Sequence, residues 1–311
     1  MHKKTKKRKA PRGANAARER QKKKRKLAIV MSGGGMRCAY SAGVMTALVE
    51  KFNLTEPDIV VAASGSAGNS AYYLAGQYML GAVIWIQKIS GSRLVSFKRR
   101  RFLNIDYLID EVFKKQHPLN IKELRAKKTR WLVPVTRVRD GETVFLSPPR
   151  NQDVYEYLRA AKAVPFIYGK EVRIGKEEYI DGDFGSNFGD LIQKAIQEGA
   201  ADIVAMDCSP GIEGSKRRKI LIEAAYYREK ISGNAGLMKA AKHEMQHVPI
   251  PTVPGVRIVV LAPRKNMRLS LLARKKLELR SLLNLGYADA ANNEELAKLL
   301  EDHAPTRQKP L

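Results

Sequence analysis

The chain has 311 residues and a formal net charge of +26 at pH 7, with 57 lysines and arginines against 31 aspartates and glutamates. This length suffices for one large domain with a substantial core. Two cysteines, Cys38 and Cys208, are too few for a disulfide scaffold and are typical of a reducing compartment. We therefore expect a cytoplasmic globular protein whose basic balance favours anionic partners.

Residues 1–26 form a strongly basic segment that contains 14 lysines and arginines, one glutamate and no apolar periodicity. This composition is typical of a disordered arm, and the absence of an apolar stretch after the charges predicts no signal peptide. The arm's charge suits an anionic membrane surface, RNA or DNA, and a solvated tail without a partner explains it equally well. The sequence leaves these alternatives open, and with them peripheral attachment to a membrane.

The first glycine-rich turn follows an apolar run, Leu27–Met31, which predicts a buried strand. The turn reads Ser32-Gly33-Gly34-Gly35-Met36-Arg37 and leads into a helical pattern. Glycines at a helix start leave backbone N–H groups free to bind a phosphate or the oxyanion of a tetrahedral intermediate. The turn lacks the last glycine of G-x-G-x-x-G and the Gly-Lys-Ser/Thr of a P-loop. We interpret it as an oxyanion loop.

A second turn of small residues follows the run Ile59–Val61 and reads Ala62-Ala63-Ser64-Gly65-Ser66-Ala67-Gly68. A serine between small residues on a strand-to-helix turn is the arrangement of a nucleophile elbow, whose usual pattern is G-x-S-x-G. Matching Gly68 to the last glycine makes Ser66 the candidate nucleophile and puts Ser64 where the first glycine is usual. The motif is weak by itself, because turns of small residues are common.

Residues 72–89 are apolar apart from Gln77 and Gln87, and they have a borderline length for a membrane span. A helix that leaves a nucleophile elbow crosses the core of an α/β protein and is apolar all round. We therefore predict a buried helix here.

A third motif, Asp181-Gly182-Asp183, follows two short β-rich segments at residues 171–174 and 178–180. An aspartate at a strand end and before a glycine can direct its carboxylate into a site. Asp-Gly is also among the commonest turn signals, so the motif alone predicts no more than a hairpin.

Strand-like runs alternate with helical patterns along the chain, which predicts an α/β fold. We expect a three-layer sandwich around a mostly parallel central sheet. Both small-residue turns then lie at the carboxyl ends of strands, where sites of such sheets gather. The runs are Leu27–Met31, Asp58–Val61, Trp131–Val135, Ile203–Met206 and Val256–Leu261.

The histidines offer no obvious base for a serine nucleophile, because none stands at a strand end beside a small-residue turn. His243, Glu244 and His247 match the H-E-x-x-H spacing of a zinc helix. A zinc site also needs a third ligand and an apolar stripe facing the site, and neither is evident in the sequence. We therefore expect no metal and no cofactor.

In order and approximate spacing, three of these motifs resemble those of the patatin-like phospholipase family. Gly33–Arg37 is similar to its glycine-rich oxyanion loop, Ser64–Gly68 to its nucleophile elbow and Asp181-Gly182 to its Asp-Gly-Gly/Ala motif. Two further segments add to the resemblance: Ala160–Phe166 is similar to the family's Ala-Ser-x-Ala-x-Pro helix end, and Gly286–Ala290 to a Gly-Tyr-x-Asp-Ala segment of bacterial members.

The resemblance implies a patatin-like fold and a lipid acyl hydrolase with a Ser66–Asp181 catalytic dyad. Asp181 would act as general base, and Gly33, Gly34 and Gly35 would hold the oxyanion. Arg37 would steady this loop or bind a phosphate headgroup of a phospholipid or other acyl-ester substrate. The catalytic domain would cover residues 27–265, and residues 266–311 would form a helical extension packed on it.

The chain departs from the family pattern at Cys38, Ser64 and Asp183. Cys38 stands where a glycine is usual, so its side chain could narrow or redirect the oxyanion loop. This leaves a second hypothesis open: a regulatory protein that binds polyanions or membranes on a patatin-like scaffold, with weak or no turnover.

Overall fold

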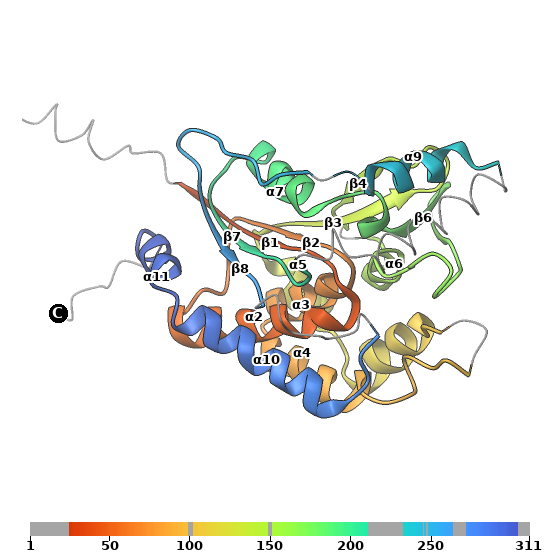
Figure 1. Cartoon of the computed structure of the whole chain (residues 1–311). Helices are drawn as coiled ribbons and strands as arrows, with labels where there is room; N and C mark the ends of the chain where they lie inside the picture. Colours follow the sequence, from red (N-terminus) through yellow and green to blue (C-terminus); the bar gives the residue numbers. More distant parts are fainter. Residues whose placement is uncertain are drawn as a thin grey trace, which may run out of the picture.

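The fold is an α/β sandwich around one mixed sheet (Figure 1). The computed structural model describes residues 25–98, 102–148, 151–210, 233–244, 246, 248–263 and 272–303. Residues 1–24 of the predicted basic arm and His247 of the histidine motif lie outside these ranges.

Eight strands form the sheet in the order β5-β6-β3-β2-β1-β7-β8, with β4 beside β3. The strands are β1 (Lys26–Met31), β2 (Ile59–Ala62), β3 (Arg130–Arg137), β4 (Thr143–Leu146), β5 (Val172–Ile174), β6 (Glu177–Asp181), β7 (Ala200–Met206) and β8 (Arg257–Leu261). The strands that are neighbours in the series β3-β2-β1-β7-β8 are parallel. Both β4 and β6 pair antiparallel with β3, and β5 pairs antiparallel with β6. The predicted mostly parallel sheet is confirmed, and every predicted run forms a strand.

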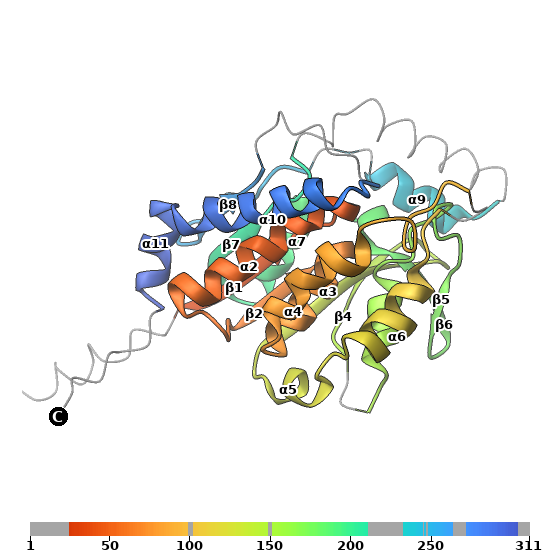
Figure 2. The same cartoon turned by 90° about the horizontal axis from the view of Figure 1, so that it is seen from below.

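Helices cover both faces of this sheet. The larger ones are α2 (Ala39–Phe52), α3 (Ser64–Leu74), α4 (Tyr78–Ile84), α7 (Phe188–Gln197) and α10 (Lys276–Ala291). Because successive strand residues point to opposite faces, Val30 packs in the core beneath α7 and its neighbour Ile29 in the larger core beneath α2 and α3. Figures 1 and 2 show α7 on one face and α2, α3, α4 and α10 on the other, which confirms the three-layer sandwich.

The remaining helical segments complete the fold. They are the 3-10 turns η1 (Gly35–Cys38) and η4 (Gly182–Phe184), the π-helical segments η2 (Trp85–Ile89) and η3 (Tyr107–Gln116), and the helices α5 (Ile121–Ala126), α6 (Val154–Ala160), α9 (Ala235–Glu244) and α11 (Glu294–Glu301).

The apolar stretch 72–89 is largely buried, as predicted, but Met79 is exposed and a turn at residues 75–77 divides the stretch between α3, α4 and η2. Tyr72, Leu74, Ile84 and Trp85 all lie in the larger core. Within the described ranges, no helix is both long and apolar enough to cross a membrane.

The helix α10 packs closely against α2, because each of the two helices places a glycine against the backbone of the other. A Cβ on Gly43 would lie 1.9 Å from the carbonyl oxygen of Leu283, and a Cβ on Gly286 would lie 2.1 Å from that of Tyr40. The Tyr40 hydroxyl also donates a hydrogen bond of 2.9 Å to Asp289. Gly286 and Asp289, which the sequence singles out, therefore attach α10 to α2, the helix that follows the glycine-rich turn.

On β7, the buried carboxylate of Asp202 gathers charged groups from distant parts of the chain. Arg25 and Arg257 each donate two hydrogen bonds to it, and His303 lies 2.8 Å from its Oδ2. Burial alone would raise the pKa of Asp202, but these hydrogen bonds outweigh it and hold the pKa below its usual value. Asp202 thus connects the start of β1 to β8 and to the end of α11.

Candidate active site

Ser64 occupies the sharp turn between β2 and α3. Its φ of 48° lies in the left-handed region, which a residue with a side chain adopts only where the fold imposes it. The next residue has to be small, since a Cβ on Gly65 would lie 2.9 Å from Sγ of Cys38. This geometry is that of a nucleophile elbow, which presents its serine hydroxyl beyond the end of the strand.

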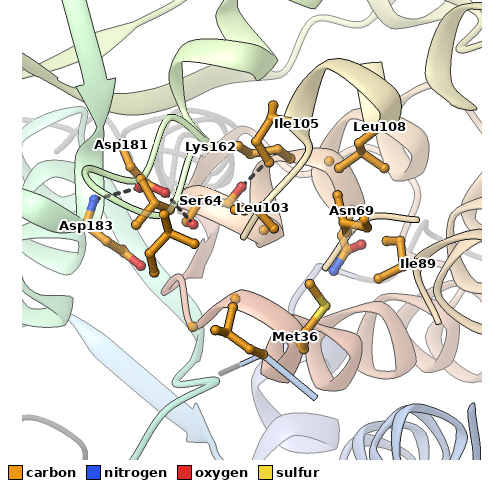
Figure 3. A pocket seen from close by; sticks show the side chains of 18 of the residues that line it. Met36, Ser64, Asn69, Ile89, Leu103, Ile105, Leu108, Lys162, Asp181 and Asp183 are labelled. Carbon is orange, nitrogen blue, oxygen red and sulfur yellow. Dashed lines mark hydrogen bonds between the residues drawn. The ribbon is translucent and has the colours of Figure 1, made fainter. Parts of the chain in front are cut away.

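The Ser64 hydroxyl donates a hydrogen bond of 2.7 Å to Oδ2 of Asp181, the last residue of β6 (Figure 3). Oδ1 of Asp181 accepts the backbone N–H of Asp183 at 3.0 Å, which fixes the carboxylate's orientation. Both Ser64 and Asp181 are buried. Burial raises the pKa of Asp181 and the nearby charge of Asp183 raises it further, against the opposing effects of Ser64 and Lys162. A basic carboxylate bonded to a serine hydroxyl is suited to accept its proton.

The serine beside Asp181 differs from the one expected. Ser66, chosen from the sequence, is completely buried, and its hydroxyl donates a 2.8 Å hydrogen bond to the carbonyl of Ser32 and lies 3.0 Å from Oγ of Ser41. The register of the turn explains the difference. The left-handed residue is Ser64, and Ser66 already belongs to the first turn of α3, from which its hydroxyl faces the base of the glycine-rich turn.

Lys162 is a buried cation beside this pair, and the sequence analysis did not identify it as a site residue. Its Nζ donates a 2.9 Å hydrogen bond to the carbonyl of Ser64, and the side chain lines the same cavity (Figure 3). Burial lowers the pKa of Lys162 to about 8, although the charge of Asp181 opposes this effect. The one available signal was a lysine within the otherwise small and apolar segment Ala160–Phe166.

The predicted oxyanion loop borders the same cavity as Asp181. Gly34 has a φ of 142° and Gly35 a φ of 58°, so the loop depends on conformations that favour glycine. Gly34 and Gly35 line the cavity together with Ser64. Gly33 packs against a carboxylate instead, since a Cβ there would lie 1.6 Å from Oδ2 of Asp183.

Two other residues singled out from the sequence, Arg37 and Cys38, are not among the described residues that line the cavity. Arg37 belongs to η1, where its backbone N–H is bonded to the carbonyl of Gly34 at 3.1 Å. Cys38 is buried beneath the elbow against Gly65 and interacts with the thiol of Cys208. Cys38 therefore supports the elbow from below, and its side chain does not enter the cavity.

His243 of the histidine motif bonds a carboxylate, with Nε2 lying 2.7 Å from Oδ2 of Asp190 on α7. The described residues contain no group of three or more histidine, cysteine, aspartate or glutamate side chains that could hold a metal ion.

A cavity of about 240 Å³ opens at Ser64 and Asp181 and extends away from them between apolar side chains. Its polar lining includes Asn69, Lys162, Asp183 and Glu244, of which Asn69 lies away from Ser64, beside Ile89 (Figure 3). Its apolar lining includes Met36, Ile84, Trp85, Ile89, Leu94, Leu103, Ile105, Leu108, Phe113 and Leu272. A serine hydroxyl bonded to a carboxylate at one end of an apolar cavity would suit a substrate with a hydrocarbon chain next to an ester group.

Comparison with known proteins identifies the family of the chain. A family model described as patatin-like phospholipase matches residues 29–189, just over half of the chain. The chain therefore belongs to the patatin-like phospholipase family, and the resemblance drawn from the sequence motifs is confirmed. Membership supports hydrolysis of lipid acyl esters as its kind of function.

Among solved structures, the crystal structure of VipD from Legionella pneumophila is similar to this chain, with a TM-score of 0.47 and 12% sequence identity. The match covers 90% of this chain and 67% of that one. No curated protein sequence matches the chain.

Proposed function

We propose that this protein hydrolyses carboxylic esters of long-chain acyl groups, phospholipids included, with Ser64 as nucleophile and Asp181 as general base. The observation that carries the proposal is the 2.7 Å hydrogen bond from the Ser64 hydroxyl to Asp181 on a strained turn at the end of an apolar cavity. Family membership supports the ester class of substrate, and the apolar lining supports an acyl chain.

The first half of the reaction acylates Ser64. Asp181 takes the hydroxyl proton while Oγ of Ser64 forms a bond to the ester carbonyl carbon, and the carbonyl oxygen becomes an oxyanion. Backbone N–H groups of the glycine loop at Gly34 and Gly35 would stabilise this charge, an interaction whose loss typically lowers the rate about a hundredfold or more. The ester C–O bond then breaks, and Asp181 returns its proton to the leaving alcohol.

The second half releases the fatty acid. Asp181 accepts a proton from water as the water oxygen attacks the acyl carbon, and the bond from that carbon to Oγ of Ser64 breaks. The same carboxyl group then returns the proton to Ser64. No histidine is among the described residues that line the cavity, so in this scheme Asp181 transfers every proton.

Lys162 acts in this scheme as a positioning residue. Asp181 has to be ionised before each cycle, yet its burial and the neighbouring Asp183 favour the protonated form. The Lys162 ammonium opposes both effects. Its hydrogen bond to the Ser64 carbonyl also holds the elbow in its left-handed conformation.

Labelling with a fluorophosphonate probe tests the proposal, because the probe reacts covalently with an activated serine hydroxyl. Wild type and Ser66→Ala should both be labelled at Ser64, whereas Ser64→Ala and Asp181→Asn should not react and should lose ester hydrolysis. Labelling that survives Ser64→Ala but disappears in Ser66→Ala would overturn the assignment. Folded protein that neither reacts nor hydrolyses an ester panel would favour the second hypothesis, a polyanion-binding protein with a silent site.

A further inference from the structure

Two phenylalanines close in sequence to the cavity-lining Leu94 and Leu103 expose their rings to solvent. Phe97 is 55% exposed and Phe102 is 38% exposed, and the ring centroids lie 5.7 Å apart. Exposed aromatic side chains that contact each other form an apolar patch, and such patches on soluble proteins commonly mark an interaction surface.

Cations surround this aromatic pair. The guanidinium of Arg274 lies 5.1 Å from the ring centroid of Phe97, and Lys98 is exposed beside it. Lys275 and Lys276, which follow Arg274 at the start of α10, are exposed as well. The sequence between the two phenylalanines is Lys-Arg-Arg-Arg, of which residues 99–101 lie outside the described ranges.

The segment that carries the aromatic pair also forms part of the cavity wall. Val95 and Leu103 form an antiparallel bridge, and Ser96 N–H donates to the carbonyl of Phe102 at 2.8 Å. Leu94 and Leu103, which adjoin this pairing, line the cavity. Backbone N–H of Gly91 bonds the carbonyl of Arg274 at 2.9 Å, so the start of α10 lies beside this segment (Figures 1 and 2). The short strand pairing that carries the two exposed rings therefore also contributes leucine side chains to the cavity wall.

We propose that Phe97, Lys98, Phe102, Arg274 and Lys276 form a docking surface for an anionic phospholipid bilayer. Phenylalanine side chains insert at the boundary between headgroups and acyl chains, and lysine and arginine bind the anionic phosphates around them. A bilayer fits better than a nucleic acid, because the apolar patch adjoins an apolar cavity. An acyl chain that leaves the bilayer at this surface would pass directly to Leu94 and Leu103. The route to Ser64 rests on the proposed function, but binding to the bilayer does not.

Flotation of the full-length protein with lipid vesicles tests the surface. The Ser64→Ala background prevents hydrolysis of the vesicles during the measurement. Vesicles of phosphatidylcholine with phosphatidylserine are compared with phosphatidylcholine alone, at low and at high salt. High salt weakens the contribution of the basic N-terminal segment, so the apolar contribution of the two rings becomes visible.

We expect Phe97→Ser/Phe102→Ser to weaken binding to anionic vesicles at least about tenfold, because two rings lose their burial. Arg274→Ala should weaken it about fivefold at low salt and less at high salt. The matched control is Met79→Ser, which removes an apolar side chain that is 51% exposed on α4 and should change binding less than about twofold.

Equal binding of the double phenylalanine variant and the control at both salt concentrations would overturn the surface. The proposal would also be overturned if the double phenylalanine variant lost binding to an RNA duplex but kept its binding to vesicles. In the Ser64 wild-type background, the double variant should keep its hydrolysis of a water-soluble short-chain ester, which shows that the fold is intact. If no variant hydrolyses any ester, the proposed function fails while the vesicle result still decides the docking surface.

Discussion

Nζ of Lys162 donates a 2.9 Å hydrogen bond to the main-chain carbonyl of Ser64, so a buried ammonium lies beside the serine–aspartate pair. Replacing Lys162 with methionine removes this charge while keeping most of the volume. The pKa of Asp181 should then rise further, and the acid limb of the kcat/KM profile should move to higher pH, because only ionised Asp181 accepts the Ser64 proton. A movement of one pH unit lowers the rate on that limb about tenfold.

The pH profile separates this electrostatic role from a structural one. The groups that face Asp181 are Ser64, Lys162 and Asp183, and Glu244 also lines the cavity. Lys162→Arg should restore the position of the acid limb. Because the pKa of Lys162 is lowered to about 8, wild type and Lys162→Met should converge above that pH. A loss of equal size at every pH would indicate damage to the fold instead.

Replacing Asp183 with asparagine should move the same limb in the opposite direction. The negative charge of Asp183 raises the pKa of Asp181, so its removal lets Asp181 ionise at lower pH. Asparagine has nearly the same shape and so keeps the contact with Gly33. Hydrolysis of a short-chain chromogenic ester across the acid range provides the measurement. An unchanged or upward-shifted acid limb would contradict this view of the site.

A single added methyl group should loosen the contact between α10 and α2. In Gly286→Ala the new Cβ meets the carbonyl oxygen of Tyr40 at 2.1 Å, so the two helices have to separate. We expect a loss of about 1–3 kcal/mol in the free energy of unfolding. Denaturant unfolding should be compared with Ser281→Ala on an exposed position of the same helix, for which a change within about 0.5 kcal/mol is expected.

Asp202 should stabilise the fold in a pH-dependent way. Its pKa in the folded state is depressed, so its contribution is present above the unfolded pKa of about 4 and is lost as pH falls below it. Asp202→Asn leaves Arg25 and Arg257 short of a buried partner and should lower stability by about 3 kcal/mol at neutral pH.

The control for this variant is Asp302→Asn. Asp302 bonds the same Arg257 at 2.6 Å but has an exposed side chain, so its replacement should lower stability by less than about 1 kcal/mol. Thermal unfolding from neutral to acid pH should show the two curves for wild type and Asp202→Asn approaching each other. A constant gap between them would argue against the role given to this carboxylate.

The sheet could be predicted because its strands are continuous apolar runs, as expected where both faces are covered. β4 was missed. Its residues are all partly exposed beside β3, so they lack the pattern of a buried strand. The order of the glycine loop, the serine turn and the Asp-Gly motif was sufficient to predict the family.

The identity of the serine beside Asp181 could not be predicted in the same way. Ser64-Gly65-Ser66-Ala67-Gly68 matches G-x-S-x-G better by letter than Ala62-Ala63-Ser64-Gly65-Ser66, in which alanine and serine replace both glycines. In the structure Ser64 occupies the turn because Ala62 and Ser66, although they are not glycines, are small enough to flank it. Lys162 was missed for a related reason: its approach to Ser64 depends on the path of the chain after α6 and leaves no local pattern.

The contact between α2 and α10 has a consequence for how the protein is made. Gly43 leaves the ribosome well before its partner Leu283, which lies far along the chain. Until then, the helix behind the glycine loop has an uncovered apolar side, which chaperones readily bind. We therefore expect ribosome-bound chains that stop before α10 to be catalytically silent. On the proposed function, ester hydrolysis would then begin only after α10 has been synthesised and has packed against α2.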